Sequence, residues 1–332
     1  MAREYNLNQR QKAGTHSGID YRAELNDQQF AAVTARPGAA LVIAGAGSGK
    51  TRTLTYRVAY LLDQEVDPKN ILLLTFTNKA SKEMLERVRE LIPHDISDLW
   101  GGTFHSICNR ILRRHAVELG FTRSFSILDR DDQKSLLKLV VDEAKIDTKN
   151  RRFPKGDILL SIFSLVENTG RTVRAILDES YPYLEEWADD IKRVHRGYNK
   201  KKLDSNSMDF DDLLVLTLKL FKKDEDLLEL YQRKFRYVLV DEYQDTNAIQ
   251  CELVDLFVGK HKSLMVVGDD AQSIYSWRGA DMQNILGFHE RYPQASVFKI
   301  EMNYRSRPEI LELSNAAIKA NLGQIPKELR AS

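Results

Sequence analysis

The chain has 332 residues, 42% of them hydrophobic and 29% charged, and a net charge of +1 at pH 7. This length allows two domains, or one large domain that carries an insertion. No apolar run is long enough to span a bilayer, no secretion signal opens the chain, and two distant cysteines imply neither disulfides nor a zinc cluster, so we expect no membrane and a cytoplasmic location.

The first elements alternate between polar and apolar segments. Residues 1–24 are polar without periodicity, which predicts a flexible extension. A helix is expected from Leu25 to Val33, with Asn26 as its cap. A strand at Ala40–Ala44 then leads through a glycine-rich turn into a helix that runs to about Leu62.

That turn has the form of a phosphate-binding loop. Gly45, Gly47 and Gly49 allow the backbone to approach an anion closely. The amides of the turn and the positive end of the next helix would cradle phosphate oxygens. Lys50 would reach the β- and γ-phosphates, and the Thr51 hydroxyl would bind Mg²⁺. The usual first glycine of the pattern is replaced by alanine at position 44.

The alternation continues with a buried strand at Ile71–Phe76 and a helix from Thr77 to about Leu91. A short extended piece ends at Gly101–Ser106. Strand, loop and helix in this order predict a parallel α/β sheet that binds its ligands at the strand ends.

From Ile107 to about Lys202 the apolar spacing is helical and strand signals are nearly absent, which predicts a helical insertion. It ends in the run Ile191–Lys202, which is rich in cations and has no acid. Such a run fits a solvated helix end, but it also suits a DNA backbone.

The strand Tyr237–Val240 ends in Asp241-Glu242, the form of a Walker B site. The first carboxylate would hold Mg²⁺ through water and the second would orient or deprotonate the attacking water. Taken alone, the pair could equally be a helix cap. The landmarks of a protein kinase are absent and the glycine spacing is not that of a dinucleotide site.

The last predicted elements are a strand at Ser263–Val267, a loop at Gly268–Ala280, a strand at Val297–Ile300 and a helix from Pro308 to about Ala320. The loop places Tyr275 and Trp277 in polar surroundings.

Eight short motifs occur in an order that resembles the UvrD/Rep/PcrA-type superfamily 1 DNA helicases, from about residue 25 to the end. They are the region of Gln29, the phosphate-binding loop, Thr75–Ala80, Gly102–His105, Asp209–Asp212, Asp241–Asp245, Gly268–Arg278 and Asn303–Ser306. The resemblance implies a first RecA-like domain at residues 25–106 and 203–296, a helical insertion at 107–202, and the incomplete start of a second RecA-like domain at 297–332. It also implies movement 3′ to 5′ on single-stranded DNA, with duplex junctions as substrates.

The same resemblance implies roles in binding and hydrolysing ATP with Mg²⁺. Gln29 would read the adenine edge, and Arg52 and Tyr304 would sandwich the base. Glu242 would act as the catalytic base, Gln272 would sense the γ-phosphate, and Arg305 would act as an arginine finger. The remaining contacts would come from the loop and the metal ligands: Gly45, Ala46, Gly47, Ser48, Gly49, Lys50, Thr51 and Asp241.

For DNA, the resemblance implies stacking by aromatic side chains and backbone contacts by polar ones. The residues concerned are Phe76, Asn78, Thr103, His105, Phe210, Tyr275, Trp277 and Arg278. Stacking suits a motor that ignores sequence, because every base has a π-face. Without the motifs, Phe76 and Phe210 would be taken for core aromatics, and His105 could cap or bridge backbone groups.

The family's later motifs are absent from this sequence, so we expect a fragment or a shortened paralogue. We expect it to bind ATP and DNA but to unwind poorly alone. Two alternatives remain: a nucleotide-gated DNA-binding regulatory module that does not unwind, and a phosphotransferase acting on a small molecule. The second leaves the aromatic loop and the basic run unexplained. The pathway, repair or replication, is not indicated.

Overall fold

The computed structural model describes residues 17–332 apart from residues 94, 147–152, 260 and 322 and the side chain of Arg278. Its centre is a six-stranded sheet with the order β3-β2-β6-β7-β1-β8, in which all neighbouring strands are parallel. The strands are β1 (Ala39–Ala44), β2 (Ile71–Thr75), β3 (Trp100–Thr103), β6 (Tyr237–Val240), β7 (Leu264–Gly268) and β8 (Ser296–Ile300). The predicted α/β class with a parallel sheet is confirmed.

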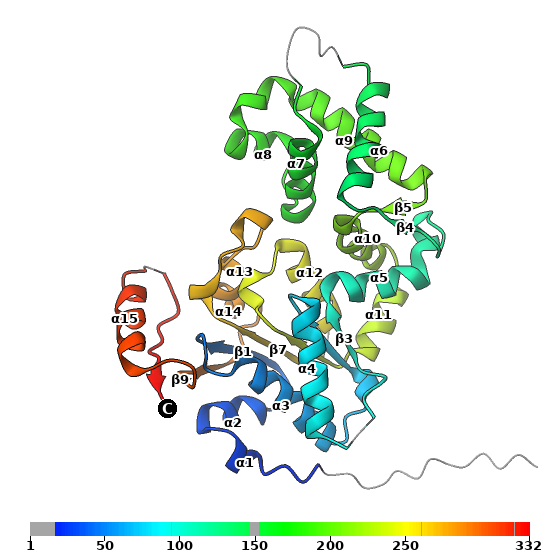
Figure 1. Ribbon diagram of the computed structural model, residues 1–332. Helices are drawn as coiled ribbons and strands as arrows, with labels where there is room; N and C mark the ends of the chain where they lie inside the picture. Colours follow the sequence, from blue (N-terminus) through cyan, green and yellow to red (C-terminus); the bar gives the residue numbers. More distant parts are fainter. Residues whose placement is uncertain (1–16, 94, 147–152, 260, 322) are drawn as a thin grey trace, which may run out of the picture.

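Helices cover both faces of this sheet (Figure 1). Alternate side chains of a strand point to opposite faces, so Leu41 and Ile43 enter one apolar core while Val42 enters the other. The first core is covered by α5 (Phe104–His115), α10 (Phe210–Lys223), α11 (Glu225–Lys234), α12 (Ala248–Val258), α13 (Gln283–Leu286) and α14 (Phe288–Arg291). The second is covered by α2 (Asp27–Val33), α3 (Lys50–Asp63) and α4 (Asn78–Leu91).

The predicted helix start near Leu25 is confirmed by its cap. The Asn26 side chain accepts a hydrogen bond from the Gln29 amide, and the Gln29 side chain accepts one from the Asn26 amide. This reciprocal arrangement satisfies two amides that the first helical turn would otherwise leave without partners. It also fixes Gln29 at the start of α2.

The expected flexible extension differs from the structure over residues 17–24; residues 1–16 lie outside the described residues. Tyr21–Glu24 form the short helix α1, capped by the side chain of Asp20. The Ser17 and Tyr21 hydroxyls donate hydrogen bonds to Asp63 at the end of α3. A polar segment without periodicity is therefore held in place by side-chain hydrogen bonds, which hydrophobic patterning does not report.

A helical unit stands above the sheet in Figure 1. It consists of α6 (Arg130–Glu143), α7 (Gly156–Thr169), α8 (Val173–Ser180) and α9 (Ala188–Asp204), which share a separate core. The chain passes into and out of the unit through the parallel pair β4 (Ser126–Ile127) and β5 (Ser207–Met208). The insertion was expected to begin at Ile107, but Ile107 and Ile111 lie in the core of the main sheet. The buried stripe of α5 explains this difference, because it faces β3 and α10.

The basic run Ile191–Lys202 forms most of α9. Its apolar side chains are buried in the helical core, and Lys202 is 4% exposed. The Lys202 ammonium lies 2.7 Å from carboxylate oxygens of both Asp209 and Asp212. The end of this run is therefore a buried ion cluster that joins the helical unit to α10.

The strand expected to open a second domain instead completes the first sheet. β8 pairs in parallel with β1, from Ser296 opposite Ala40 to Ile300 opposite Ala44. Beyond it, β9 (Met302–Asn303) pairs with β10 (Arg330–Ala331). The helix α15 (Pro308–Ile318) lies between these two strands along the chain. The second lobe, at the left of Figure 1, thus begins after Ile300. Among the described residues, no helix is long and apolar enough to cross a membrane.

Candidate functional site

The loop between β1 and α3 is shaped by glycines in the left-handed region. Gly47 has φ +72° and Gly49 has φ +88°, a conformation that other residues rarely adopt. A Cβ at Gly47 would also lie 2.6 Å from the Arg305 side chain and 2.8 Å from that of Asn303. Within the described structure, no side chain caps the first turn of α3. Its backbone amides and the helix dipole therefore form an anion site next to Lys50.

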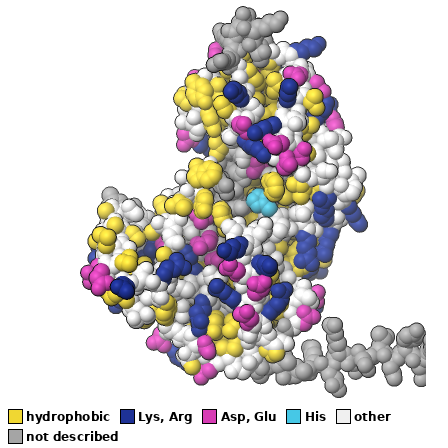
Figure 2. Space-filling view, in the orientation of Figure 1, with side chains coloured by type: hydrophobic (Ala, Val, Ile, Leu, Met, Phe, Trp, Pro, Cys, Tyr) yellow, Lys and Arg dark blue, Asp and Glu magenta, His cyan; other side chains and the backbone are white. Residues whose placement is uncertain are grey.

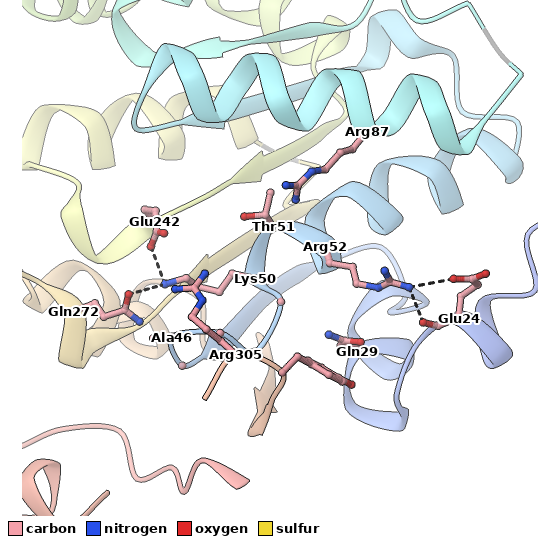
Figure 3. Close-up of a pocket in the computed structure, with 14 residues that line it drawn as sticks. Glu24, Gln29, Ala46, Lys50, Thr51, Arg52, Arg87, Glu242, Gln272 and Arg305 are labelled. Atoms are coloured by element: carbon pink, nitrogen blue, oxygen red, sulfur yellow. Dashed lines mark hydrogen bonds and ion pairs between the residues drawn. The ribbon is translucent and has the colours of Figure 1, made fainter. Parts of the chain in front are cut away.

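A cavity of about 800 Å³ opens over this loop (Figure 3). Its walls come from the loop, from the helices α1 to α4, from the segments after β6 and β7, and from the segment after β9. The lining residues are Glu24, Gln29, Gly45, Ala46, Gly47, Gly49, Lys50, Thr51, Arg52, Arg87, Glu242, Gln272, Tyr304 and Arg305. The structure thus brings together most of the residues predicted to bind ATP. Ser48 and Asp241 do not line the cavity, because both are buried behind it.

Lys50 connects the three elements at the centre of the cavity. Its ammonium lies 3.0 Å from Oε2 of Glu242 and donates a 3.3 Å hydrogen bond to Oε1 of Gln272. Glu242 holds a left-handed backbone conformation with φ +49° and ψ +47°. Such a conformation is unfavourable for a non-glycine residue and is concentrated at functional sites. It turns the chain directly after β6, where the carboxylate can face the cavity.

Asp241 fits a magnesium ligand by its position and its chemistry. It follows β6 and is 4% exposed, and its amide pairs with the carbonyl of Leu74. Burial, reinforced by the charge of Glu242 and opposed by Lys50, raises the pKa of Asp241 to about 7. A buried carboxylate with a raised pKa favours the binding of a cation, which offsets the cost of its charge. Thr51 lines the same cavity, and its side chain carries a hydroxyl oxygen, a type of ligand that suits Mg²⁺.

The far end of the cavity holds the residues predicted to bind the base. The Gln29 side chain is buried, and its amide donates a 3.0 Å hydrogen bond to the carbonyl of Ser48. Arg52 donates to the carbonyl and carboxylate of Glu24. The Tyr304 ring is 53% exposed, and its hydroxyl accepts a hydrogen bond from Asn26. Gln29, Arg52 and Tyr304 therefore surround one space, but each is already engaged by the protein.

Asn303 connects the second lobe to the phosphate-binding loop. Its Nδ2 donates a 2.5 Å hydrogen bond to the carbonyl of Ala46, and its Oδ1 accepts from the amides of Arg305 and Ser306. The amide of Tyr304 also donates to the carbonyl of Gly47. This side chain thus sets the position of Arg305 at the mouth of the cavity. Its individual role was not predicted, although it opens the motif Asn303–Ser306.

Two more residues of the site were not predicted individually, although Gln244 lies within the motif Asp241–Asp245. Arg87, on α4, lines the cavity, and Figure 3 shows its guanidinium directed toward Thr51. Gln244 lies behind Glu242, to which its Nε2 donates a 2.8 Å hydrogen bond. Its Oε1 accepts from the amide of Asp269. The packing of α4 brings Arg87 to the site, and the turn after β6 places Gln244 behind Glu242.

A second cavity of about 670 Å³ lies between the sheet and the helical unit. Five of the residues predicted to bind DNA line it: Phe76, Thr103, His105, Tyr275 and Trp277. The rings of Phe76 and Tyr275 have centroids 5.0 Å apart, and those of Tyr275 and Trp277 are 6.4 Å apart. Trp277 is 66% exposed. These rings offer stacking faces in a groove that reaches both units.

Two of the other three predicted DNA ligands, Phe210 and Asn78, contact residues that line this cavity. Phe210 is 53% exposed, which argues against a core role, and its ring meets that of His105 edge-on with centroids 6.1 Å apart. Burial lowers the pKa of His105. Asn78 accepts a 3.4 Å hydrogen bond from the Thr103 hydroxyl. The side chain of Arg278 lies outside the described residues.

Two short segments each contribute lining residues to both cavities. After β6, Glu242 lines the first cavity while Asp245 and Asn247 line the second. After β7, Gln272 lines the first cavity while Tyr275 and Trp277 line the second. The residues that line the two cavities are therefore only a few positions apart on each of these segments.

Comparisons with known proteins agree with this geometry. Residues 25–293 match the family model described as the UvrD/REP helicase N-terminal domain. The chain is 46% identical over 306 residues to an ATP-dependent DNA helicase PcrA of Staphylococcus epidermidis, which covers 92% of this chain and 41% of that protein. It is 45% identical over 306 residues to the ATP-dependent DNA helicase PcrA of Staphylococcus aureus, with the same coverage. The chain thus spans about two fifths of the length of these relatives.

Proposed function

The chain belongs to the UvrD/REP helicase family, and from this membership we propose that it is the ATP-binding part of a DNA-dependent ATPase that drives an ATP-dependent DNA helicase. ATP with Mg²⁺ is its substrate, and single-stranded DNA and duplex junctions are its partners. A cytoplasmic location is part of this proposal. The proposal does not specify repair or replication.

One observation carries this proposal: the segments after β6 and β7 each contribute to both cavities. Gln244 strengthens this connection, because its side chain donates hydrogen bonds to both Glu242 and Asp245. A strand held by Tyr275 would shift Gln272, three residues away on the same loop. DNA binding can therefore alter the groups around the phosphates.

In the first cavity each residue has a distinct task. Lys50 and the loop amides hold the phosphates, and Gln29, Arg52 and Tyr304 hold the base. Glu242 orients or deprotonates the attacking water, while Gln272 responds to the γ-phosphate. Thr51 and Asp241 would hold Mg²⁺, which would neutralise charge on the phosphates. Arg305 adds a cation at the mouth of the cavity, where charge develops during transfer.

The contacts of Lys50 suggest how the site changes on binding. Its ammonium is now held between Glu242 and Gln272. A γ-phosphate would draw the ammonium away, because two phosphate oxygens carry more charge than one carboxylate and one amide. Glu242 and Gln272 would then be released toward the water that attacks.

The experiment measures ATP affinity and turnover with and without a single-stranded oligonucleotide, with Lys50→Ala as control. We expect DNA to raise turnover or to change nucleotide affinity, and the variant to lose both responses. If DNA leaves turnover and affinity unchanged, coupling between the cavities is wrong. ATP affinity is the primary readout, because the later motifs of the family are not among these residues.

The alternative is a nucleotide-gated DNA-binding module that does not unwind. We propose that these 332 residues alone unwind poorly, since the family's later motifs are absent from the sequence. A tailed duplex with a labelled strand tests this point. Robust strand release with ATP would contradict it, and DNA binding gated by ATP without release would favour the module.

A further inference from the structure

A group of cations surrounds Trp100 on the flank of the sheet, away from both cavities. Trp100 begins the edge strand β3 and is 1% exposed. Three cations lie over its ring: Arg110 Cζ at 3.8 Å, Lys234 Nζ at 4.2 Å and Arg114 Cζ at 5.1 Å from the centroid. Together with Arg113 and Arg123 we call these side chains the Trp100 cluster. Figure 2 shows Lys and Arg side chains gathered on the right flank, where α5 and α11 lie in Figure 1.

The cluster surrounds a hollow. A cavity of about 480 Å³ is lined by Arg113, Arg114, His115, Arg123, Leu230, Tyr231 and Lys234. Arg113 is fixed at its rim, because it donates to the carbonyls of Arg123 and Phe125. Arg114 and Arg123 are exposed. The hollow is wide enough for a phosphate and its sugar, with cations on its rim and Leu230 and Tyr231 among its lining.

The carboxylate of Asp98 acts electrostatically on Arg110 and Lys234 of the Trp100 cluster. Among the residues that the structure describes, no carboxylate forms an ion pair with any of its five members. Burial, together with the charges of Arg114 and Arg110 and against that of Asp98, lowers the pKa of Lys234. Other cations of α10 and α11 are neutralised: Lys222 pairs with Glu252 at 2.6 Å and Arg233 with Glu229 at 2.7 Å. Cations crowded in this way are stabilised when an anion binds.

The rings in the cluster are covered, which separates it from the groove. Trp100 lies under three cations, and Arg113 Cζ lies 3.7 Å from the centroid of Phe125. Both rings and Tyr231 are buried. Bases of a single strand bind by stacking on exposed rings, as Trp277 offers in the groove. A surface of cations without free rings instead suits the backbone of a duplex, whose bases are already stacked inside.

The position of the cluster fits a ligand that also occupies the groove. His105, in the first turn of α5, lines the groove, and Arg114 lies nine residues further along this helix. At 1.5 Å per residue the two are about 14 Å apart along the axis. We propose that the Trp100 cluster is a second DNA site, which binds the phosphate backbone of double-stranded DNA next to the single strand in the groove. This inference rests on the proposed function, because it takes DNA as the ligand.

The test compares two double variants that remove the same charge from the 332-residue chain. Arg114→Gln with Arg123→Gln alters the cluster, and Lys222→Gln with Arg233→Gln is the matched control on paired cations. The probes are a blunt hairpin duplex and an oligo(dT) strand, and Kd is measured over a range of salt. Losing two phosphate contacts should reduce the slope of log K against log salt by about 2 and weaken duplex binding at least about fivefold near 0.1 M salt.

We expect the cluster variant to keep its affinity for oligo(dT) and the control to keep both affinities. Trp277→Ala should show the reverse pattern, with weaker oligo(dT) binding and an unchanged duplex slope. Equal losses in cluster variant and control would overturn the proposal, as would an unchanged duplex slope or an equal loss for oligo(dT). A Glu-rich peptide is a third probe: if the cluster variant loses affinity for this peptide but not for the duplex, the surface binds an acidic protein segment and the proposal is wrong. If the unaltered chain binds neither DNA probe, the proposed function itself fails.

Discussion

The ammonium of Lys50 lies 3.0 Å from the carboxylate of Glu242, so the residue expected to bind phosphate and the candidate base are in direct contact. The contact joins the first turn of α3 to the residue after β6. These two positions are 192 residues apart in the chain. They meet because β1 and β6 both lie beside β7.

Glu242→Gln should therefore separate binding from turnover. The amide keeps the shape of the side chain but removes the base and the attraction to Lys50. We expect ATP affinity to be retained or improved, while DNA-stimulated turnover falls by about 10² or more. Equilibrium binding of a fluorescent ATP analogue and a phosphate-release assay measure the two effects. Turnover that stays within a few-fold of the unaltered chain would remove Glu242 from its assigned role.

Asn303 should control nucleotide affinity through the position of the loop. Asn303→Asp keeps the acceptor for the amides of Arg305 and Ser306 but loses the donor to Ala46. We expect both Asn303→Asp and Asn303→Ala to weaken ATP binding, and Asn303→Ala to lower the unfolding free energy further, by about 1–3 kcal/mol. Calorimetric ATP titration and chemical denaturation provide the two readouts. Unchanged ATP affinity in both variants would show that the loop does not depend on this side chain.

Trp277 should contribute to single-stranded DNA binding through stacking. Trp277→Ala should weaken oligo(dT) binding by about 1–3 kcal/mol, with ATP affinity unchanged in the absence of DNA. Tyr183→Ala is a matched control, because Tyr183 is 67% exposed and Trp277 is 66% exposed, yet Tyr183 lies on the helical unit outside the groove lining. Fluorescence anisotropy measures both variants. Similar losses in the two variants would contradict a specific stacking role.

Asp212 should make stability depend on pH. Burial, together with the charge of Asp209 and against that of Lys202, raises the pKa of Asp212 from 3.8 to about 7. The folded chain then binds a proton that the unfolded chain has released. The contribution of this group to stability is therefore full below about pH 4 and is lost as the pH rises to about 7, at up to about 1.4 kcal/mol per pH unit.

Asp212→Asn should flatten this dependence between pH 5 and 7, because the variant cannot ionise. Asp132→Asn is the control, since Asp132 occupies the same position in the capping box of α6 but is exposed. Urea unfolding at several pH values measures the slopes. If Asp212→Asn and the unaltered chain show parallel slopes, Asp212 is ionised throughout and the expected proton uptake is wrong.

Local patterns in the sequence were sufficient for the elements around the phosphate site. The apolar run Ala40–Ala44, the glycines and Lys50 predict a strand, a turn and a helix, and the structure has each at nearly these bounds. The cap at Asn26 was equally predictable. These features depend on side chains within a few residues of one another, where conformational preference and hydrogen bonding act directly.

The boundaries between units were less predictable, because they depend on which core a helix or strand joins. The apolar spacing that begins at Ile107 would suit any amphipathic helix. Only the contacts of α5 with β3 assign this helix to the main sheet. The apolar side chain of Val297 would suit a strand of either domain. Only the pairing of β8 with β1 shows that β8 is an edge strand of the first sheet. The core that a helix or strand joins is decided by the packing of the whole fold. The local sequence pattern carries little information about it.

The sequence by itself thus determined the phosphate-binding loop, the parallel α/β class and the family to which the chain belongs, because each depends on residue types at short fixed spacings. Only the tertiary structure brought Lys50 to Glu242, placed Arg87 at the same cavity and gathered cations from α5 and α11 over Trp100. Distance along the chain does not limit such contacts once strands pair. Their geometry follows from sheet order and helix packing, which are fixed by burial of the whole core.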